Sequence, residues 1–323
     1  MHWRAVVTGI ALGAACSGLA GAVQPYPEKP IHLVIGLPAG GGADAIARFL
    51  AAALGDAVGQ PVVVENRPGS NGLIAAEAVA RSSPDGYTLL FGGVTSAALM
   101  PALGKKLSFD PSTDLTPVSL VASLPMVLVV GSATPIRTLP DLLAFAKAHP
   151  GQTNYASSGN GSALQLSMEL LKSRTGLDAT HIPYKGGVQA IPDLLSGQIH
   201  AMFEILPTQV ANIKAGKVRA LAVTSARRNS QIPEVPTMAE AGVPDFDAAI
   251  WYTVFAPGHT PPAIIEALNV RISALLRSAQ LRRRLEELGA EAVPSTPQDV
   301  LRLQKTELER WTGVIRRAGV TLD

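Results

Sequence analysis

Short apolar runs alternate with apolar stripes of helical spacing along most of this chain. The first run, residues 31–35, is rich in β-branched side chains and is typical of a buried strand. Between residues 43 and 58 the apolar side chains instead recur at the spacing of one helix face. Pro38 and the run Gly40 to Gly42 separate these segments, so the sequence predicts a strand, a glycine loop and a helix in that order.

The same alternation continues as far as residue 96. Further strands are predicted at residues 61–65 and 87–91, with a helix at residues 72–81 between them. The third strand ends in a second loop of small residues, 92–96. An order of strand, helix and strand implies a parallel sheet with helices on both faces.

A second alternating series follows a long β-branched segment, residues 118–130, which Pro125 interrupts. Its strands are predicted at residues 153–156, 180–183, 199–203 and 218–223, and its helices after Thr138 and at residues 164–171, 191–195 and 210–214.

The C-terminal part is predicted to return to the first series. A strand at residues 251–256 is followed by a helix at 261–288 and a last helix capped by Thr296. The last helix is expected to face inward with Leu301, Leu308, Trp311 and Ile315.

These elements predict an α/β protein of two lobes. We expect residues 23–124 and 250–323 to form one lobe and residues 125–249 the other, with two strands crossing between them. Residues 250–323 should therefore pack on the first lobe.

The first 22 residues differ from the rest. Arg4 precedes an apolar run, rich in Ala and Gly, that ends in Ala20-Gly21-Ala22, a pattern typical of a secretory signal peptide cleaved after Ala22. The run is marginal in length for a permanent membrane span. Cys16 lies inside it, and whether this cysteine is lipidated stays open. Because the mature chain then has no cysteine, an exported protein without disulfides is expected, which indicates the bacterial periplasm.

Composition and motifs narrow the class of function. With 47% hydrophobic and 16% charged residues over 323 positions, the chain is typical of a well-cored globular protein. A net charge of +2 is too small to indicate nucleic-acid binding. The mature chain lacks Cys, the Gly-x-Ser-x-Gly and His-Glu-x-x-His motifs, and histidines at metal-ligand spacing. We therefore expect no catalytic residue, cofactor or metal site.

Four loops at the carboxyl ends of the predicted parallel strands remain, and open α/β sheets bind their ligands there. The loops supply N–H groups and hydroxyls but few fixed charges, which favours capture of a small anion in a hinged cleft. We expect Gly41 and Gly159 to shape this anion site. The candidate ligand-binding residues are Ala39, Gly40, Gly41, Gly42, Asp44, Thr95, Ser96, Ser157, Ser158, Gly159, Gly161, Ser162, Tyr184, Lys185, Gly186 and Glu204.

Several motifs along the mature chain share one resemblance. They are Tyr26-Pro-x-Lys-Pro-Ile, Pro38-x-Gly-Gly-Gly-x-Asp44, Pro84-Asp-Gly-Tyr-Thr-Leu-Leu90, Tyr155-Ala-Ser-Ser-Gly159 and His181-x-Pro-Tyr-Lys-Gly186. Through them the chain resembles the Bug family, the periplasmic substrate-binding proteins of tripartite tricarboxylate transporters.

The resemblance implies a two-lobed periplasmic-binding-protein fold of type II. It also implies an organic acid as ligand, a monomer, and the large and small membrane subunits of such a transporter as partners. Which acid is bound, and whether a dedicated transporter exists, do not follow from it. The alternatives are a secreted α/β enzyme with an unrecognised site and a sensor that presents its ligand to a membrane kinase.

Glu204 and Asp44 are the two carboxylates among the candidate ligand-binding residues. Glu204 occupies a place where the family commonly has Asp, and we expect it to tune which acid is accepted; capping of the helix near Pro207 is the alternative. For Asp44, capping of its own helix is favoured over contact with the ligand.

Overall fold

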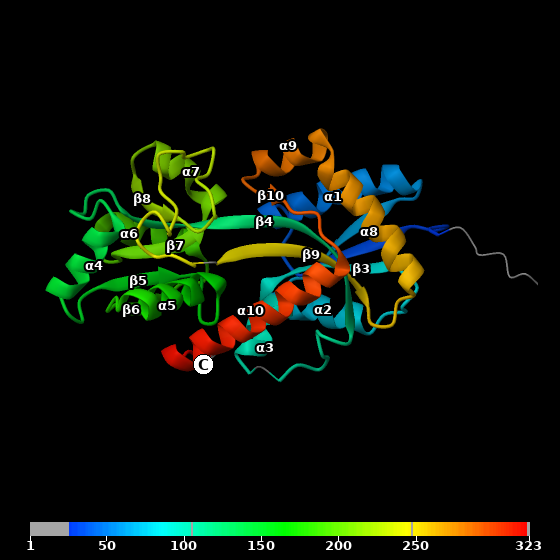
Figure 1. Cartoon of the computed structure of the whole chain (residues 1–323), viewed down its shortest axis with the longest axis horizontal. Helices are drawn as coiled ribbons and strands as arrows, with labels where there is room; N and C mark the ends of the chain where they lie inside the picture. The colour runs from blue at the N-terminus through cyan, green and yellow to red at the C-terminus, as the bar shows by residue number, and fades with distance from the viewer. Residues whose placement is uncertain (1–25, 105, 247, 322–323) are drawn as a thin grey trace, which may run out of the picture.

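The computed structural model describes residues 26–104, 106–246 and 248–321, and the predicted signal sequence with Cys16 lies outside these ranges. The described chain forms two lobes side by side, each a sheet with helices on both faces (Figure 1). This is the two-lobed α/β architecture that the sequence predicts.

Three parallel strands form the outer part of the sheet in the first lobe. β1 (Ile31–Ile35) lies between β2 (Val62–Asn66) and β3 (Thr88–Gly93), in agreement with the predicted alternation. The connecting helices α1 (Gly42–Val58) and α2 (Leu73–Ala80) pack on opposite faces, so the apolar side chains of β1 are buried on both sides, and only His32 is exposed in this strand.

β4 (Leu115–Gly131) runs through both lobes as one strand. The sequence predicts an interruption at Pro125, but the strand continues through this residue. As far as Pro125, β4 pairs antiparallel with β9 (Ala249–Pro257), and from Met126 onward it pairs with strands of the second lobe. Proline is usually confined to the edges of ladders, and here it stands where β4 changes partners. The N–H of Met126 is satisfied by Thr224 Oγ1 at 2.9 Å.

The change of partners also marks a boundary. Pro125 lies opposite Ala249, the first residue of β9. We propose that the lobes divide here, with residues 26–124 and 250–321 in the first lobe and residues 125–249 in the second.

The second lobe repeats the arrangement of the first. β5 (Asn154–Ser157) lies between β6 (Thr180–Pro183) and β7 (Ala201–Ile205) in parallel, and β7 and β8 (Val218–Val223) flank β4 in antiparallel pairs. Both lobes therefore have mixed sheets, each with three neighbouring parallel strands, which are β2, β1 and β3 in the first lobe and β6, β5 and β7 in the second. The helices of this lobe are α4 (Leu139–Ala148), α5 (Ala163–Thr175), α6 (Ile191–Ser196) and α7 (Leu206–Lys214).

The helix expected at residues 261–288 is two helices, α8 (Pro262–Arg277) and α9 (Ala279–Glu287). Ser278 separates them because its backbone is extended, with ψ of 141°, and its hydroxyl accepts the N–H of Leu281 as an N-cap. The short strand β10 (Glu291–Ala292), which periodicity does not reveal, then pairs with β4.

The last helix, α10 (Pro297–Ala318), begins with the predicted Thr296 cap, but its buried face differs from the expected one. Leu301 and Leu308 are 46% and 36% exposed. Val300, Gln304, Glu307 and Val314 are buried together with the correctly predicted Trp311 and Ile315. The inward stripe is thus displaced around the helix from the one that the leucines suggest.

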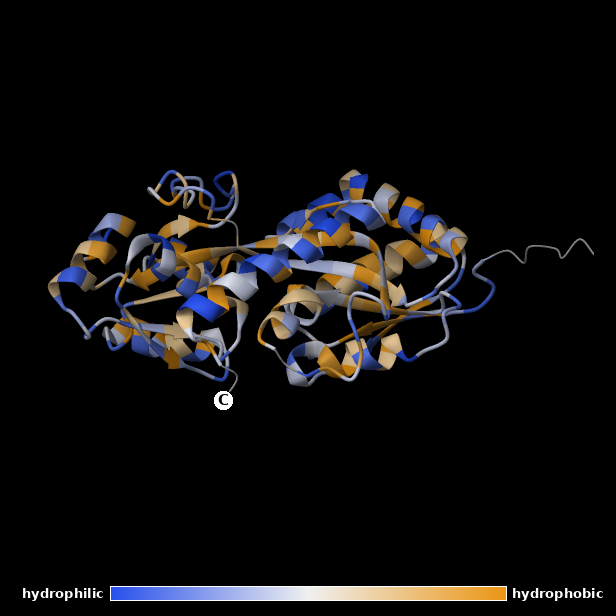
Figure 2. Cartoon of the chain, turned by 60° about the horizontal axis from the view of Figure 1, so that its bottom comes forward, coloured by the Kyte–Doolittle hydropathy of each residue, from blue (hydrophilic) through white to orange (hydrophobic). Residues whose placement is uncertain are grey.

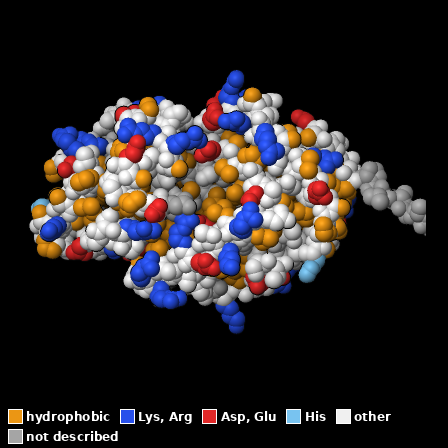
Figure 3. Space-filling model, in the orientation of Figure 1, with side chains coloured by type: hydrophobic (Ala, Val, Ile, Leu, Met, Phe, Trp, Pro, Cys, Tyr) orange, Lys and Arg blue, Asp and Glu red, His pale blue; other side chains and the backbone are white. Residues whose placement is uncertain are grey.

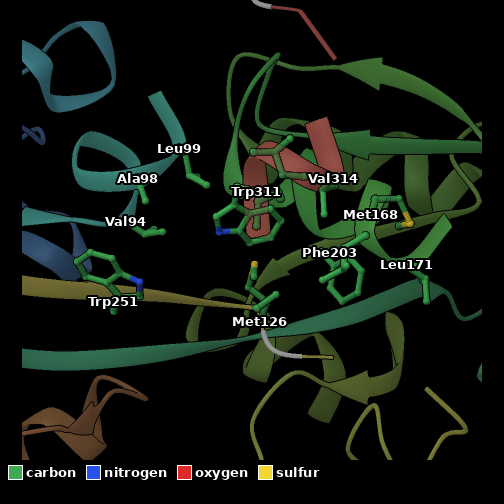
Figure 4. Close-up of a cluster of buried hydrophobic side chains, with 14 of the residues drawn as sticks. Val94, Ala98, Leu99, Met126, Met168, Leu171, Phe203, Trp251, Trp311 and Val314 are labelled. Carbon is green, nitrogen blue, oxygen red and sulfur yellow. The ribbon is translucent and has the colours of Figure 1, made fainter. Parts of the chain in front are cut away.

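α10 packs on the first lobe, as expected for residues 250–323, and also on the second. Its neighbours are α3 (Met100–Ala102) and the helical turn η2 (Thr95–Leu99) of the first lobe, and α5 of the second. In Figure 4, Trp311 and Val314 lie between Val94, Ala98 and Leu99 on one side and Met168 and Phe203 on the other. One apolar cluster therefore continues across the two lobes.

Hydropathy follows this packing. Figure 2 shows apolar residues concentrated on the strands, while polar residues lie on the outer faces of the helices. Basic and acidic side chains are interspersed over the face drawn in Figure 3. None of the helices in the described ranges combines the length and the hydropathy needed to span a membrane.

Candidate functional site

A cavity of about 310 Å³ lies between the two lobes. The first lobe contributes Gly36, Leu37, Asn71, Gly72, residues 90–96 and residues 250–252. The second lobe contributes Ser158, Ser162, Ala163, Leu164, Gly187, Val188, Glu204 and Ile205. The volume of the cavity is at the lower end of the range for small-molecule sites. A ligand held here would contact both lobes at once.

The wall from the first lobe is built where β3 ends. Gly92 and Gly93 close the strand, and the helical segment begins immediately at Val94. Thr95 and Ser96 therefore lie at the N-terminal end of that segment and line the cavity. The hydroxyl of Ser96 donates to the carbonyl of Gly93 at 3.4 Å, which holds the turn.

The wall from the second lobe is the loop between β5 and α5. Ser162 caps α5, and its hydroxyl accepts the N–H of Gln165 at 3.2 Å. Ser158, Ser162 and the first residue of α5, Ala163, line the cavity. Because the N-terminus of a helix carries partial positive charge and unpaired N–H groups, this wall favours an anion.

A chain of hydrogen bonds holds this loop from behind. Gln165 accepts the N–H of Gly161 at 2.7 Å and donates its amide N–H to Nδ1 of His181 at 3.0 Å. Nε2 of His181 then donates to the hydroxyl of Ser157 at 2.7 Å, and Ser157 bonds both the N–H and the carbonyl of Gly159 at 3.1 Å. This order requires a neutral imidazole, and burial lowers the pKa of His181.

Glu204 is the one carboxylate among the residues that line the cavity within the described ranges. It lies inside β7, opposite Val127 of β4, and is only 3% exposed. Oε1 accepts the N–H of Ile205 at 2.8 Å, whereas Oε2 has no hydrogen-bond partner among the described residues. Burial raises the pKa of this carboxyl group. Since it reaches no N–H within α7, Glu204 is not a cap of that helix.

No Lys, Arg or His lines the cavity in the described part of the chain. Tyr252 is the other ionisable residue of the lining, and burial raises its pKa to about 12, so the phenol is neutral. Within the same ranges no group of three His, Cys, Asp or Glu side chains is placed to hold a metal ion. The cavity can therefore recognise a ligand through neutral donors and apolar contact.

The structure brings five of the predicted site residues together on the cavity: Thr95, Ser96, Ser158, Ser162 and Glu204. The other eleven lie outside its lining, and ligand contact by them stays a prediction. They are Ala39, Gly40, Gly41, Gly42, Asp44, Ser157, Gly159, Gly161, Tyr184, Lys185 and Gly186.

Asp44 fastens the glycine loop instead of facing the cavity. Its Oδ2 accepts the N–H of Gly40 and Nε of Arg48, both at 2.9 Å, and its Oδ1 accepts Nδ2 of Asn66 at 2.8 Å. The bond from Arg48 is the main reason why the pKa of Asp44 is lowered to about 2. Gly41 is the N-cap of α1 and has no side-chain cap hydrogen bond, and Asp44 accepts no backbone N–H within this helix. The favoured capping interpretation is therefore wrong, and Asp44 instead holds the loop that precedes α1.

Several other predicted residues support the loops around the cavity. Ser157 is fully buried and bonds His181, as described above. The hydroxyl of Tyr184 donates to Asp193 at 2.5 Å, and Lys185 is exposed. Gly159 has φ of +121°, a conformation that side chains rarely adopt, whereas Gly41 has φ of −81° and room for a β-carbon. The expected backbone constraint therefore applies to Gly159 and not to Gly41.

Several residues that line the cavity were not predicted from the sequence. The largest of them are Trp251 and Tyr252, near the start of β9. They lie at the strand's N-terminal end, and the rule used for the loops considers only carboxyl ends. Asn71 was also missed, although the Asn71-Gly72 pair is a turn signal that could have drawn attention to it.

Comparison with known proteins gives the family. Residues 46–320 match the profile described as "Tripartite tricarboxylate transporter family receptor". The chain belongs to this family. Its members are periplasmic receptors, which bind substrates and are not enzymes, so the resemblance seen in the sequence is confirmed.

Relatives and solved structures agree with this assignment. Protein BugT of Bordetella pertussis is 39% identical over 329 aligned residues that cover 100% of both chains. A structure of an R. palustris protein with adipate is 38% identical, with a TM-score of 0.81 and coverage of 92% of this chain and 99% of that one. MatC of Rhodopseudomonas palustris, with bound malate, is 33% identical, with a TM-score of 0.75 and coverage of 90% and 100%. This receptor family thus includes proteins of the same fold that hold small dicarboxylates.

Proposed function

We propose that this receptor captures a small organic carboxylate in the cavity between its lobes and delivers it to the membrane subunits of a tripartite tricarboxylate-type transporter. The observation that carries the proposal is the composition of the cavity. Hydroxyls and helix N-termini from both lobes converge on it, and no basic side chain lines it within the described ranges.

Such a lining suits a carboxylate that must be released again. Neutral donors and helix N-termini stabilise an anion without a buried ion pair, and each donor contributes about 0.5–1.5 kcal/mol. Contact with both lobes would favour a closed arrangement, since a ligand shifts a conformational equilibrium by its difference in affinity for the two states. The adipate and malate held by two similar structures are acids of this class.

The remaining parts of the proposal concern place and partners. Residues 1–22 are proposed to direct export to the periplasm and to be removed after Ala22, so that Val23 begins a mature, monomeric receptor. Mass spectrometry of the periplasmic protein should find an N-terminus at or beside Val23. A chain that keeps residues 1–22 in the cytoplasm would contradict this part.

The ligand class is tested by thermal shift and calorimetry on the mature chain. The panel contains adipate, malate, succinate, citrate and benzoate, with the corresponding amides as uncharged controls. An acid at about 100 times its Kd should add roughly 2.7 kcal/mol to the free energy of unfolding and raise the Tm by a few degrees. The acid should be recovered unchanged. If no acid in the panel shifts the Tm, the proposal fails.

The position of the site is tested with the first acid found to bind. Ser158→Ala removes a hydroxyl from the cavity and should weaken binding about fivefold to tenfold, which corresponds to roughly 1–1.4 kcal/mol. Ser173→Ala makes the same change on the exposed part of α5 and should leave the affinity unchanged. Equal affinities for the two variants would place the ligand elsewhere.

A further inference from the structure

The unpaired oxygen of Glu204 is the strongest unused feature of the cavity. Glu204 is 3% exposed, and Oε2 has no hydrogen-bond partner among the described residues. An unsatisfied buried oxygen is costly, and a carboxylate without a counter-ion still more so. The group therefore requires either a cation, a donor or a proton of its own.

Among the described residues no cation is paired with Oε2 of Glu204, and Lys185, in the loop before Gly187, is exposed. β4 and β5, which flank β7, contain no charged residue. On α5, Lys172 is paired with Glu169 at 2.9 Å and Arg174 is exposed in the last turn. On α7, Lys214 is exposed at the end of the helix away from Glu204. Across the cavity the ionisable residue is Tyr252, which is neutral.

The hydrogen bonds of Glu204 determine which oxygen carries a proton. Oε1 accepts the N–H of Ile205, and the carbonyl oxygen of a carboxylic acid is a better acceptor than its hydroxyl oxygen. A proton on Glu204 therefore belongs on Oε2, beside Gly187 in the cavity wall. Burial independently favours the protonated form, because it raises the pKa of the group.

We infer that Glu204 takes part in ligand binding as the neutral carboxylic acid, donating from Oε2 to the bound carboxylate directly or through one water molecule. At a pH above the pKa of Glu204, capture of the anion is then accompanied by uptake of one proton. The cavity also discriminates against acids that present an ammonium group to this residue. The inference rests on the proposed function and makes Glu204 a specificity-determining residue.

Proton uptake is measured by calorimetry at pH 6, 7 and 8, in buffers of different ionisation enthalpy. Adipate and malate are the probes. In wild type, affinity should fall by up to tenfold per pH unit above the pKa of Glu204, and the binding enthalpy should depend on the buffer. Glu204→Gln should remove both effects. Glu266→Gln, which makes the same change of charge at an exposed site on α8, should retain them. A wild type without proton uptake would overturn the inference.

Malate and aspartate provide a second, matched comparison, since they share a skeleton and differ in a hydroxyl against an ammonium group. Wild type should bind malate more tightly. Glu204→Gln, which is also neutral and also carries a donor, should keep the difference, whereas Glu204→Ala should narrow it. Preference for aspartate that disappears in Glu204→Gln would mean that Glu204 acts as an ionised partner, and would overturn the inference.

A measurement without ligand separates the two proposals. A carboxyl group whose pKa is raised in the folded state contributes stability that is complete below its unfolded pKa and is lost as pH rises through the folded pKa. The urea midpoint of wild type relative to Glu204→Gln should therefore decrease as pH rises above about 4.3. A difference that does not change with pH overturns the inference about Glu204. Failure of every acid to bind overturns the proposed function instead.

Discussion

The carboxyl group of Glu204 lies against Gly187, where any other residue would carry a side chain. A β-carbon at Gly187 would lie only 1.8 Å from Oε2 of Glu204. The two residues come from separate elements, the strand β7 and the turn η3 (Gly187–Ala190), and both line the cavity. The missing side chain of one is therefore what permits the buried acid of the other.

Gly187→Ala should displace this carboxyl group. The atoms in the way belong to the end of the Glu204 side chain, which can turn aside, so we expect weaker binding of carboxylates and a loss of stability of only about 1 kcal/mol. Urea unfolding and calorimetry measure the two effects. In the background of Glu204→Ala the added methyl group meets no carboxyl, and the same substitution should cost less, with a coupling of at least about 0.5 kcal/mol. Strictly additive losses would show that the two residues do not compete for space.

Asp44→Asn should destabilise the fold without changing affinity. Because the pKa of Asp44 is lowered to about 2, its contribution is complete above its unfolded pKa and is lost as pH falls through the folded one. We expect a cost of about 2 kcal/mol at pH 7 that disappears between pH of about 4 and 2. Asp56→Asn, on the exposed end of the same helix, is the control. A large loss of affinity at unchanged stability would instead place Asp44 at the ligand.

Gly159→Ala should strain the loop that carries Ser158. At φ of +121° a side chain costs about 1–3 kcal/mol, and the added carbon would also lie 3.4 Å from the carbonyl oxygen of Tyr184. We expect lower stability and weaker binding of the first identified acid. Gly41→Ala, at φ of −81°, should change stability by less than about 0.5 kcal/mol. If both variants behave alike, the conformation of Gly159 does not support the site.

His181 should make the second lobe sensitive to acid. Its pKa is lowered by burial, so its contribution is complete above its unfolded value of about 6.5 and is lost as pH falls toward the folded value. Protonation would also turn an Nδ1–H toward the amide of Gln165. His181→Gln does not titrate, so wild type should lose its advantage over this variant as pH falls below about 6.5, as followed by urea unfolding. The exposed His149→Gln serves as control, and an equal response from it would contradict the role of His181.

Local sequence patterns were sufficient to predict most of the helices and strands. The periodicity of residues 43–58 corresponds to α1, and the predicted caps at Thr138 and Thr296 are both present as capping boxes. Such features join residues within about one helical turn, so the sequence contains them entirely. The break at Ser278 is the exception, since apolar spacing continues on both sides of it and conceals the cap.

The predictions that proved wrong concern residues whose environment depends on contacts between distant segments of the chain. Leu301 and Leu308 follow a helical period, yet the inward face of α10 is decided by where α5 and η2 lie against it. Pro125 interrupts an apolar run in the sequence but is tolerated within β4, because the partner of the strand changes there.

The sequence by itself determined that this chain forms two α/β lobes with small-residue loops, because strand and helix periods are local properties of its apolar residues. Only the tertiary structure decided which side chains of those loops reach the ligand. Ser157 and Ser158 are neighbours of the same type, yet the first bonds His181 of β6 and the second lines the cavity. Neighbouring side chains on an extended chain point to opposite sides, so the packing of β5 against β6 settles which serine is buried. Glu204 acquires its unpaired oxygen in the same way, because Gly187 approaches it from another part of the chain.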